Sequence, residues 1–62
     1  MYAKLREERL RQNFTAQEMS KLLGLKTTSA YYKKENGKIK ISIDEALKIS
    51  NKLSKKVEDI FM

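Results

Sequence analysis

Hydrophobic residues recur along the chain at spacings of three and four, and no long run alternates between apolar and polar positions. Such spacings place side chains on one face of a helix, whereas a half-buried strand requires strict alternation. There is no proline, and the only glycines are Gly24 and Gly37. The pattern predicts an all-α fold, a compact bundle of about five helices forming one domain over residues 1–62.

The first predicted helix runs from about Tyr2 to Gln12. Leu5 and Leu10, together with Tyr2, are expected to form its apolar edge, while the charged residues between them face solvent. Asn13 tolerates the left-handed conformation that ends many helices, so the helix is expected to stop there.

The second predicted helix begins at Thr15, because its hydroxyl and Glu18 three residues later fit the capping-box pattern. Phe14, just before the cap, is expected to pack against the start of this helix. Gly24 allows the positive φ of a helix-ending turn. The predicted buried face consists of Met19, Leu22 and Leu23, and Leu25 is expected to re-enter the core after the turn.

Thr27 is the predicted N-cap of a third helix that ends at about Glu35, before the turn pair Asn36-Gly37. Lys34 is expected to lay its hydrocarbon stem on the core and to keep its amine in water. The inner side of this helix is expected to carry Ala30 and Tyr31, and the outer side Thr28, Ser29, Tyr32 and Lys33.

Residues 38–42, KIKIS, have no neighbouring strand to pair with and are expected to form an extended loop. A second capping box, Ser42 with Glu45, opens a fourth predicted helix that ends at about Leu53. A short helix over residues 57–61 is expected to close the core with Val57, Ile60 and Phe61. The apolar stripe predicted for the fourth helix consists of Ile43, Ala46, Leu47, Ser50 and Leu53.

The positive charge is concentrated in one stretch of the chain. The net charge is +6, and residues 21–40 alone hold six lysines and one acid. Clustered lysines favour a polyanionic partner, because contacts to phosphates release counterions, although a solvated basic surface kept for solubility is the alternative. A chain this short buries only about 60% of its unfolded surface, so marginal stability or association is expected.

Composition argues against several other functions. The chain has no cysteine and no histidine, so a disulfide framework and a Cys/His metal site are ruled out, and a reducing cytoplasm fits. The carboxylates occur as adjacent pairs on predicted helix surfaces, and no glycine-rich phosphate loop exists, so we expect no enzyme activity, cofactor or small-molecule ligand. No apolar run approaches the length of a membrane span, and the N-terminus is too charged for a signal peptide.

Two short helices joined at Gly24, with lysines after the second, form the pattern of a helix-turn-helix. The N-terminal residues of such a second helix approach base edges in the major groove most closely. Thr28 and Ser29 are therefore predicted base contacts, with Lys33 able to donate to guanine and Tyr32 to pack on a thymine methyl. The alternatives are ordinary helix-start residues, a tyrosine that covers the helix, and solvated lysines.

Four strings in order resemble the Cro/repressor class of helix-turn-helix proteins, often called XRE-type, over about residues 5–61: LREERLRQNFT, FTAQEMSKLLG, AYYKKENGK and SIDEALKISNKLSKKVEDIF. The resemblance implies a lambda-repressor-like bundle, and an ion pair between Arg9 and Glu35 that ties the first helix to the reading helix. It also implies phosphate contacts near Thr15 and in the loop after the third helix. Where the family often has a glutamine directly after the cap, this chain has Ala16, so that phosphate contact either passes to Gln17 or is lost. The predicted DNA-contact residues are Thr15, Gln17, Thr27, Thr28, Ser29, Tyr32, Lys33, Asn36, Lys38 and Lys40.

These observations predict a sequence-specific DNA-binding regulator, of the kind found in phages and mobile elements, that binds an inverted-repeat operator as a homodimer. The last three residues, Ile60, Phe61 and Met62, are the predicted dimer contact, with capping of the core as the alternative. Two other roles stay open. One is an antitoxin or accessory factor that depends on a protein partner, and the other is a protein-interaction module that has lost DNA reading.

Overall fold

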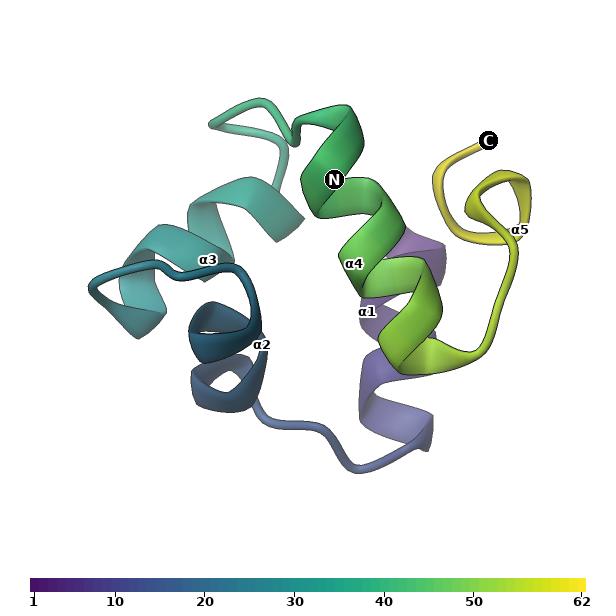
Figure 1. Ribbon diagram of the computed structural model, residues 1–62, viewed down its shortest axis with the longest axis horizontal. Helices are drawn as coiled ribbons and strands as arrows, with labels where there is room; N and C mark the ends of the chain where they lie inside the picture. Colours follow the sequence, from purple (N-terminus) through teal and green to yellow (C-terminus); the bar gives the residue numbers. More distant parts are fainter.

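The computed structural model describes residues 1–62 and contains five α-helices and no strand, which confirms the predicted all-α class. Helices α2 and α3 lie together on one side of α4, and α5 lies on its other side (Figure 1). None of the five helices has the length and apolarity needed to cross a bilayer. Their bounds are Ala3–Arg11 for α1, Ala16–Leu22 for α2, Thr28–Glu35 for α3, Ile43–Leu53 for α4 and Val57–Phe61 for α5.

Three helices begin at the caps that the sequence predicts. The hydroxyls of Thr15, Thr27 and Ser42 each accept a hydrogen bond from the backbone N–H three residues later, at 3.1 Å. In α2 and α4 the glutamate at that position accepts in turn from the cap backbone, which completes both capping boxes. Caps of this kind satisfy N–H groups that have no partner within the helix, so they fix where each helix starts.

Four helices end on a residue with positive φ, at Asn13, Gly24, Gly37 and Ser54. After α3, the Lys38 N–H donates to the Lys33 carbonyl at 2.8 Å, and the Gly37 N–H donates to the Lys34 carbonyl. This is a Schellman arrangement, which occupies carbonyls that the last helical turn leaves free. It also folds the loop after α3 back towards the end of that helix.

The core is formed by residues from all five helices. Tyr31 of α3 and Glu35 one turn later are completely buried, and Leu5 of α1 is buried among them. Phe14, Leu22 and Leu25 are partly buried and pack against the core, as expected. The buried hydrophobic residues are Leu5, Ala16, Met19, Leu23, Tyr31, Ile49, Leu53 and Ile60.

The apolar edge predicted for α1 is wrong at Leu10, whose side chain is 54% exposed. Five residues along a helix correspond to a rotation of about 140°, so Leu10 cannot share the face of Leu5. The residue one turn after Leu5 is Arg9, and it is Arg9 that enters the core, at 4% exposure. A buried arginine was the less obvious assignment, because charged residues are rarely fully buried unless they are paired.

The stripe predicted for α4 is also wrong at two positions. Ile43 is 81% exposed and Leu47 is 49% exposed, whereas Ile49, which the prediction left out, is completely buried. Ala46, Ser50 and Leu53 do face the core, as predicted, and together with Ile49 they form a set that also has helical spacing. Both sets fit a helix period, so the sequence pattern did not decide between them, and an apolar face of α4 remains uncovered.

Lys34 does not keep its amine in water. Its Nζ donates to a carboxylate oxygen of Glu45 at 3.0 Å and to the Lys40 carbonyl at 3.1 Å, with little of either side chain exposed. The contact connects α3 to the first turn of α4 and holds the intervening loop. Desolvation alone would raise the pKa of Glu45, but its hydrogen bonds with Ser42 and Lys34 outweigh that effect and lower it.

Candidate nucleic-acid interface

The exposed side of α3 carries the residues predicted to read DNA. Ser29, Tyr32 and Lys33 are exposed and Thr28 is half-buried, at positions that share one face of the helix. Tyr31 points the other way and is fully buried. The helix therefore presents its first turn and one long polar face to solvent, with a five-residue turn, residues 23–27, separating it from α2.

A buried ion pair fixes the position of α3. Arg9 of α1 donates to both carboxylate oxygens of Glu35, from Nε at 2.8 Å and from Nη2 at 3.2 Å. Its Nη1 donates to the Phe14 carbonyl at 3.0 Å, and the Tyr31 hydroxyl donates to Glu35 at 2.7 Å. The ion pair that the family resemblance implies is thus present. It joins α1, the loop after α1 and α3 in one hydrogen-bonded cluster.

Tyr32 lies at the edge of this cluster. The Arg9 guanidinium is 5.9 Å from the ring centroids of both Tyr31 and Tyr32, and the two rings are 6.3 Å apart. Tyr32 is nevertheless 45% exposed, and with the exposed Leu10 and the half-buried Phe14 it lines an open hollow of about 340 Å³. One side of the ring is held by the protein and the rest is free, so its role in base contact stays a prediction.

Several lysines on α3 and in the segments before and after it have no acidic partner. The Lys34–Glu45 pair is internal, which leaves five lysines between residues 21 and 40. All five are exposed, and none forms an ion pair. The Schellman turn holds the backbone of Lys38 against that of Lys33, so two of these positive charges extend from neighbouring points. The five lysines are Lys21, Lys26, Lys33, Lys38 and Lys40.

The predicted contacts at the start of α2 are more constrained than the sequence suggested. The Thr15 hydroxyl accepts from the Glu18 N–H and donates to the Glu18 carboxylate, both at 3.1 Å. These hydrogen bonds, the one from the Thr15 backbone first, lower the pKa of Glu18. A phosphate approaching Thr15 would meet that carboxylate, whereas Gln17 and Asn36 are exposed polar side chains.

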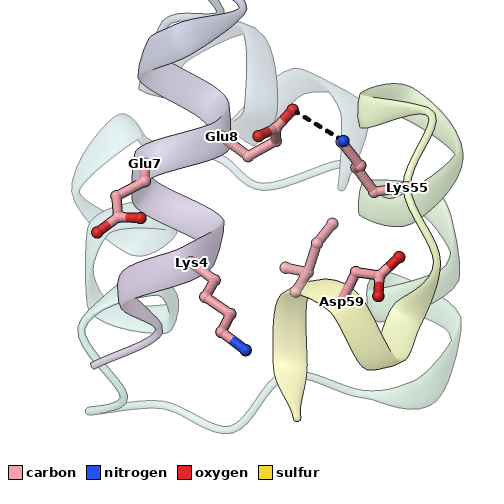
Figure 2. A pocket seen from close by; sticks show the side chains of 6 residues that line it. Lys4, Glu7, Glu8, Lys55 and Asp59 are labelled. Atoms are coloured by element: carbon pink, nitrogen blue, oxygen red, sulfur yellow. Dashed lines mark ion pairs between the residues drawn. The ribbon is translucent and has the colours of Figure 1, made fainter.

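A separate hollow lies between α1 and α5. Lys4 and Glu8 of α1 face Lys55 and Asp59 across a volume of about 190 Å³, and Glu7, whose carboxylate points away from them, also contributes to the lining (Figure 2). The Lys55 Nζ lies 3.8 Å from Glu8, which also pairs with Arg11, and the hydrogen bond from Arg11 is the main reason that the pKa of Glu8 is lowered. No residue of α3 lines this hollow, and acids outnumber lysines around it, so it differs in charge from a phosphate site.

The three C-terminal residues predicted as a dimer contact differ in how exposed they are. Ile60 is part of the core at 3% exposure, and Phe61 packs edge-on against the Tyr2 ring, with 5.3 Å between centroids. Met62 is 83% exposed. Ile60 therefore caps the core and does not lie on the surface, and a dimer contact at this end of the chain reduces to Met62 and the exposed part of Phe61.

Comparison with known proteins agrees with this arrangement. Residues 5–60 match a family model described as Helix-turn-helix. The chain belongs to the Cro/repressor-like, XRE-type helix-turn-helix family. This family consists of DNA-binding regulators, and the match covers all of α2, α3 and α4. Comparison with curated proteins and with solved structures gave no match.

Tyr31 gives the buried cluster a testable pH dependence. Burial, and then the hydrogen bond to Glu35, raise the pKa of Tyr31 above its usual value of 10.0. An unfolded tyrosine releases its proton near pH 10 while the folded one retains it, so the free energy of unfolding falls above about pH 10, by about 1.4 kcal/mol per pH unit. Below that pH this group contributes no slope.

Tyr31→Phe is expected to lose this alkaline slope and to cost about 1 kcal/mol at neutral pH, because one hydrogen bond to Glu35 disappears. Urea unfolding measured from neutral to alkaline pH would show both effects. Tyr2→Phe, which removes a tyrosine hydroxyl outside the cluster, is the matched control. Coincident alkaline slopes for wild type and Tyr31→Phe would contradict the assignment.

Proposed function

We propose that the protein is a sequence-specific transcriptional regulator, most simply a repressor, that binds operator DNA through α3. The proposal is supported by the exposed polar face of α3 together with five exposed lysines between residues 21 and 40 that have no acidic partner. An α-helix fits the major groove, and lysines around it contact phosphates and fix the register. Family membership supports the same assignment.

The side chains of α3 are expected to discriminate only weakly between bases. Thr28 and Ser29 offer hydroxyls that both donate and accept, so they discriminate bases weakly, and α3 carries no arginine, asparagine or glutamine. Lys33 is the strongest donor on this face. Phosphate contacts and sequence-dependent DNA shape are therefore proposed to supply much of the affinity.

The operator is proposed to be an inverted repeat bound by two copies of the chain. The molecule measures 26 Å along its longest axis, so one copy covers a single half-site. Half-sites one helical turn apart have centres separated by about 34 Å. A single small reading domain buries too little surface for tight, specific binding, whereas two copies on one site double it.

Selection of bound sequences from a random duplex library, followed by a salt titration of the selected site, tests the proposal. The sequences recovered should show two half-sites related by symmetry. If Lys33, Lys38 and Lys40 each meet a phosphate or base, log K should fall with log salt with a slope of about −3 for each copy bound. Absence of binding to any duplex at low salt would contradict the proposal and favour a protein-interaction module.

A further inference from the structure

The outer face of α4 is apolar and nothing in the chain covers it. Ile43 and Leu47 lie one turn apart on the same side of this helix, and they are among the most exposed large hydrophobic side chains of the protein. Asp44 and Lys48, also one turn apart, flank them. Both are exposed, and neither forms an ion pair within the chain.

We infer that this face binds the same face of a second copy, with the two α4 helices antiparallel across a two-fold axis. The two-fold axis is perpendicular to the plane that contains the two helices. It reverses the direction of the second helix but keeps the Asp44 and Lys48 flank of both copies on the same side of that plane. If the axis passes between the first and second turns, Ile43 meets Leu47 of the other copy, and Asp44 meets Lys48. Symmetry repeats each of these contacts, so apolar side chains meet apolar side chains and opposite charges meet at both ends of the interface.

The antiparallel orientation has further support in the helix itself. Antiparallel neighbours place the positive N-terminal end of one helix dipole beside the negative C-terminal end of the other. No residue of α3 belongs to this face, so the polar side of the reading helix stays free. The face belongs to one eleven-residue helix, so the dimer is weak in free solution and DNA strengthens it by holding both copies on one site.

The role of this dimer in operator binding rests on the proposed function. The pairing of the two α4 helices does not, because self-association can be measured without DNA. The pairing also places the dimer contact on α4 and not at the C-terminal residues. Met62 is exposed but isolated, since Ile60 is in the core and Phe61 is packed against Tyr2.

Charge reversal on the flank tests the pairing without disturbing the core. In the Asp44→Lys variant, residues 44 and 48 are both lysines, so two lysines of one copy face two lysines of the other. In the Lys48→Asp variant both positions are aspartates, so four acids face each other in the same way. Each variant is expected to weaken self-association about tenfold, because attraction becomes repulsion at two symmetric positions. An equimolar mixture of the two variants is expected to recover association, as a heterodimer in which every flanking contact joins opposite charges.

Sedimentation equilibrium of the full chain from micromolar to millimolar concentration provides the measurement, and circular dichroism checks that each variant folds. Lys56→Asp and Glu58→Lys reverse exposed charges away from this face and are the matched controls, expected to associate like wild type when alone. Met62→Ser tests the C-terminal end and is likewise expected to associate like wild type.

The outcomes separate the inference from the proposed function. If the mixture associates no better than either variant, or if the wild type stays monomeric at every concentration, the α4 pairing is wrong, while operator binding is judged independently from the salt titration. If the mixture recovers association but no duplex is bound, the α4 pairing stands and the proposed function fails.

Discussion

Arg9→Ala is expected to remove a large part of the free energy of unfolding, about 3–5 kcal/mol. Arg9 is almost fully buried and donates three hydrogen bonds, two to Glu35 and one to the Phe14 carbonyl. Its removal leaves the Glu35 carboxylate buried without a positive partner, which costs about 3–5 kcal/mol. A domain of 62 residues has a total stability of about 3–9 kcal/mol, so the loss is comparable to the whole.

Urea or thermal unfolding followed by circular dichroism measures this loss. Arg11→Ala is the matched control, since Arg11 pairs with Glu8 on the surface, and such pairs contribute about 0–1 kcal/mol. Arg9→Met combined with Glu35→Gln should be less destabilised than Arg9→Met alone, because the unpaired buried charge is gone. A cost below about 1 kcal/mol for Arg9→Ala would show that the cluster does not hold α3 in place.

Substitutions on α3 and in the loop after it are expected to weaken DNA binding in two different ways. Thr28→Ala with Lys33→Ala should lower affinity for the selected operator about tenfold to a hundredfold, and bring it closer to the affinity for random duplex, because base contacts carry the sequence preference. Lys38→Ala with Lys40→Ala should lower affinity for both duplexes by the same factor and make the salt slope shallower by about 2 for each copy bound.

Fluorescence anisotropy with the selected operator and a scrambled duplex, over a series of salt concentrations, distinguishes the two effects. Lys4→Ala with Lys56→Ala removes the same charge outside α3 and its loop, and should leave the preference and most of the slope unchanged. If the double variant at Thr28 and Lys33 lowers the affinity for both duplexes by the same factor, α3 contributes charge and does not read sequence.

The helix boundaries could be predicted because they depend on contacts between residues close in the chain. Thr15 and Ser42 each accept a hydrogen bond from the backbone of a glutamate three residues later, a contact that the local sequence alone indicates. Asn13 and Gly24 end their helices because they tolerate a positive φ, at 62° and 70°. The end of α4 at Leu53 is also as predicted, although the positive φ after it, 55°, falls on Ser54 and not on a glycine or asparagine.

The buried cluster was only partly predictable. The resemblance implies the Arg9–Glu35 pair, and the spacing of four between Tyr31 and Glu35 is a local signal for the hydrogen bond that joins them along α3. The amine of Lys34 was expected in water, and its partner, Glu45, lies eleven residues away. Contacts at such separations follow from the packing of helices and not from local sequence pattern.

The sequence by itself determined the number of helices, most of their ends, and the concentration of positive charge in residues 21–40, because caps, turns and net charge are local properties. Only the tertiary structure decided which face of each amphipathic helix enters the core. In α4 both Ile49 and the pair Ile43 and Leu47 connect to Leu53 through helical spacings of three and four, and packing of Ile49 and Leu53 against the other helices left Ile43 and Leu47 outside. The face we assign to a second copy is therefore visible only once the helices are packed together.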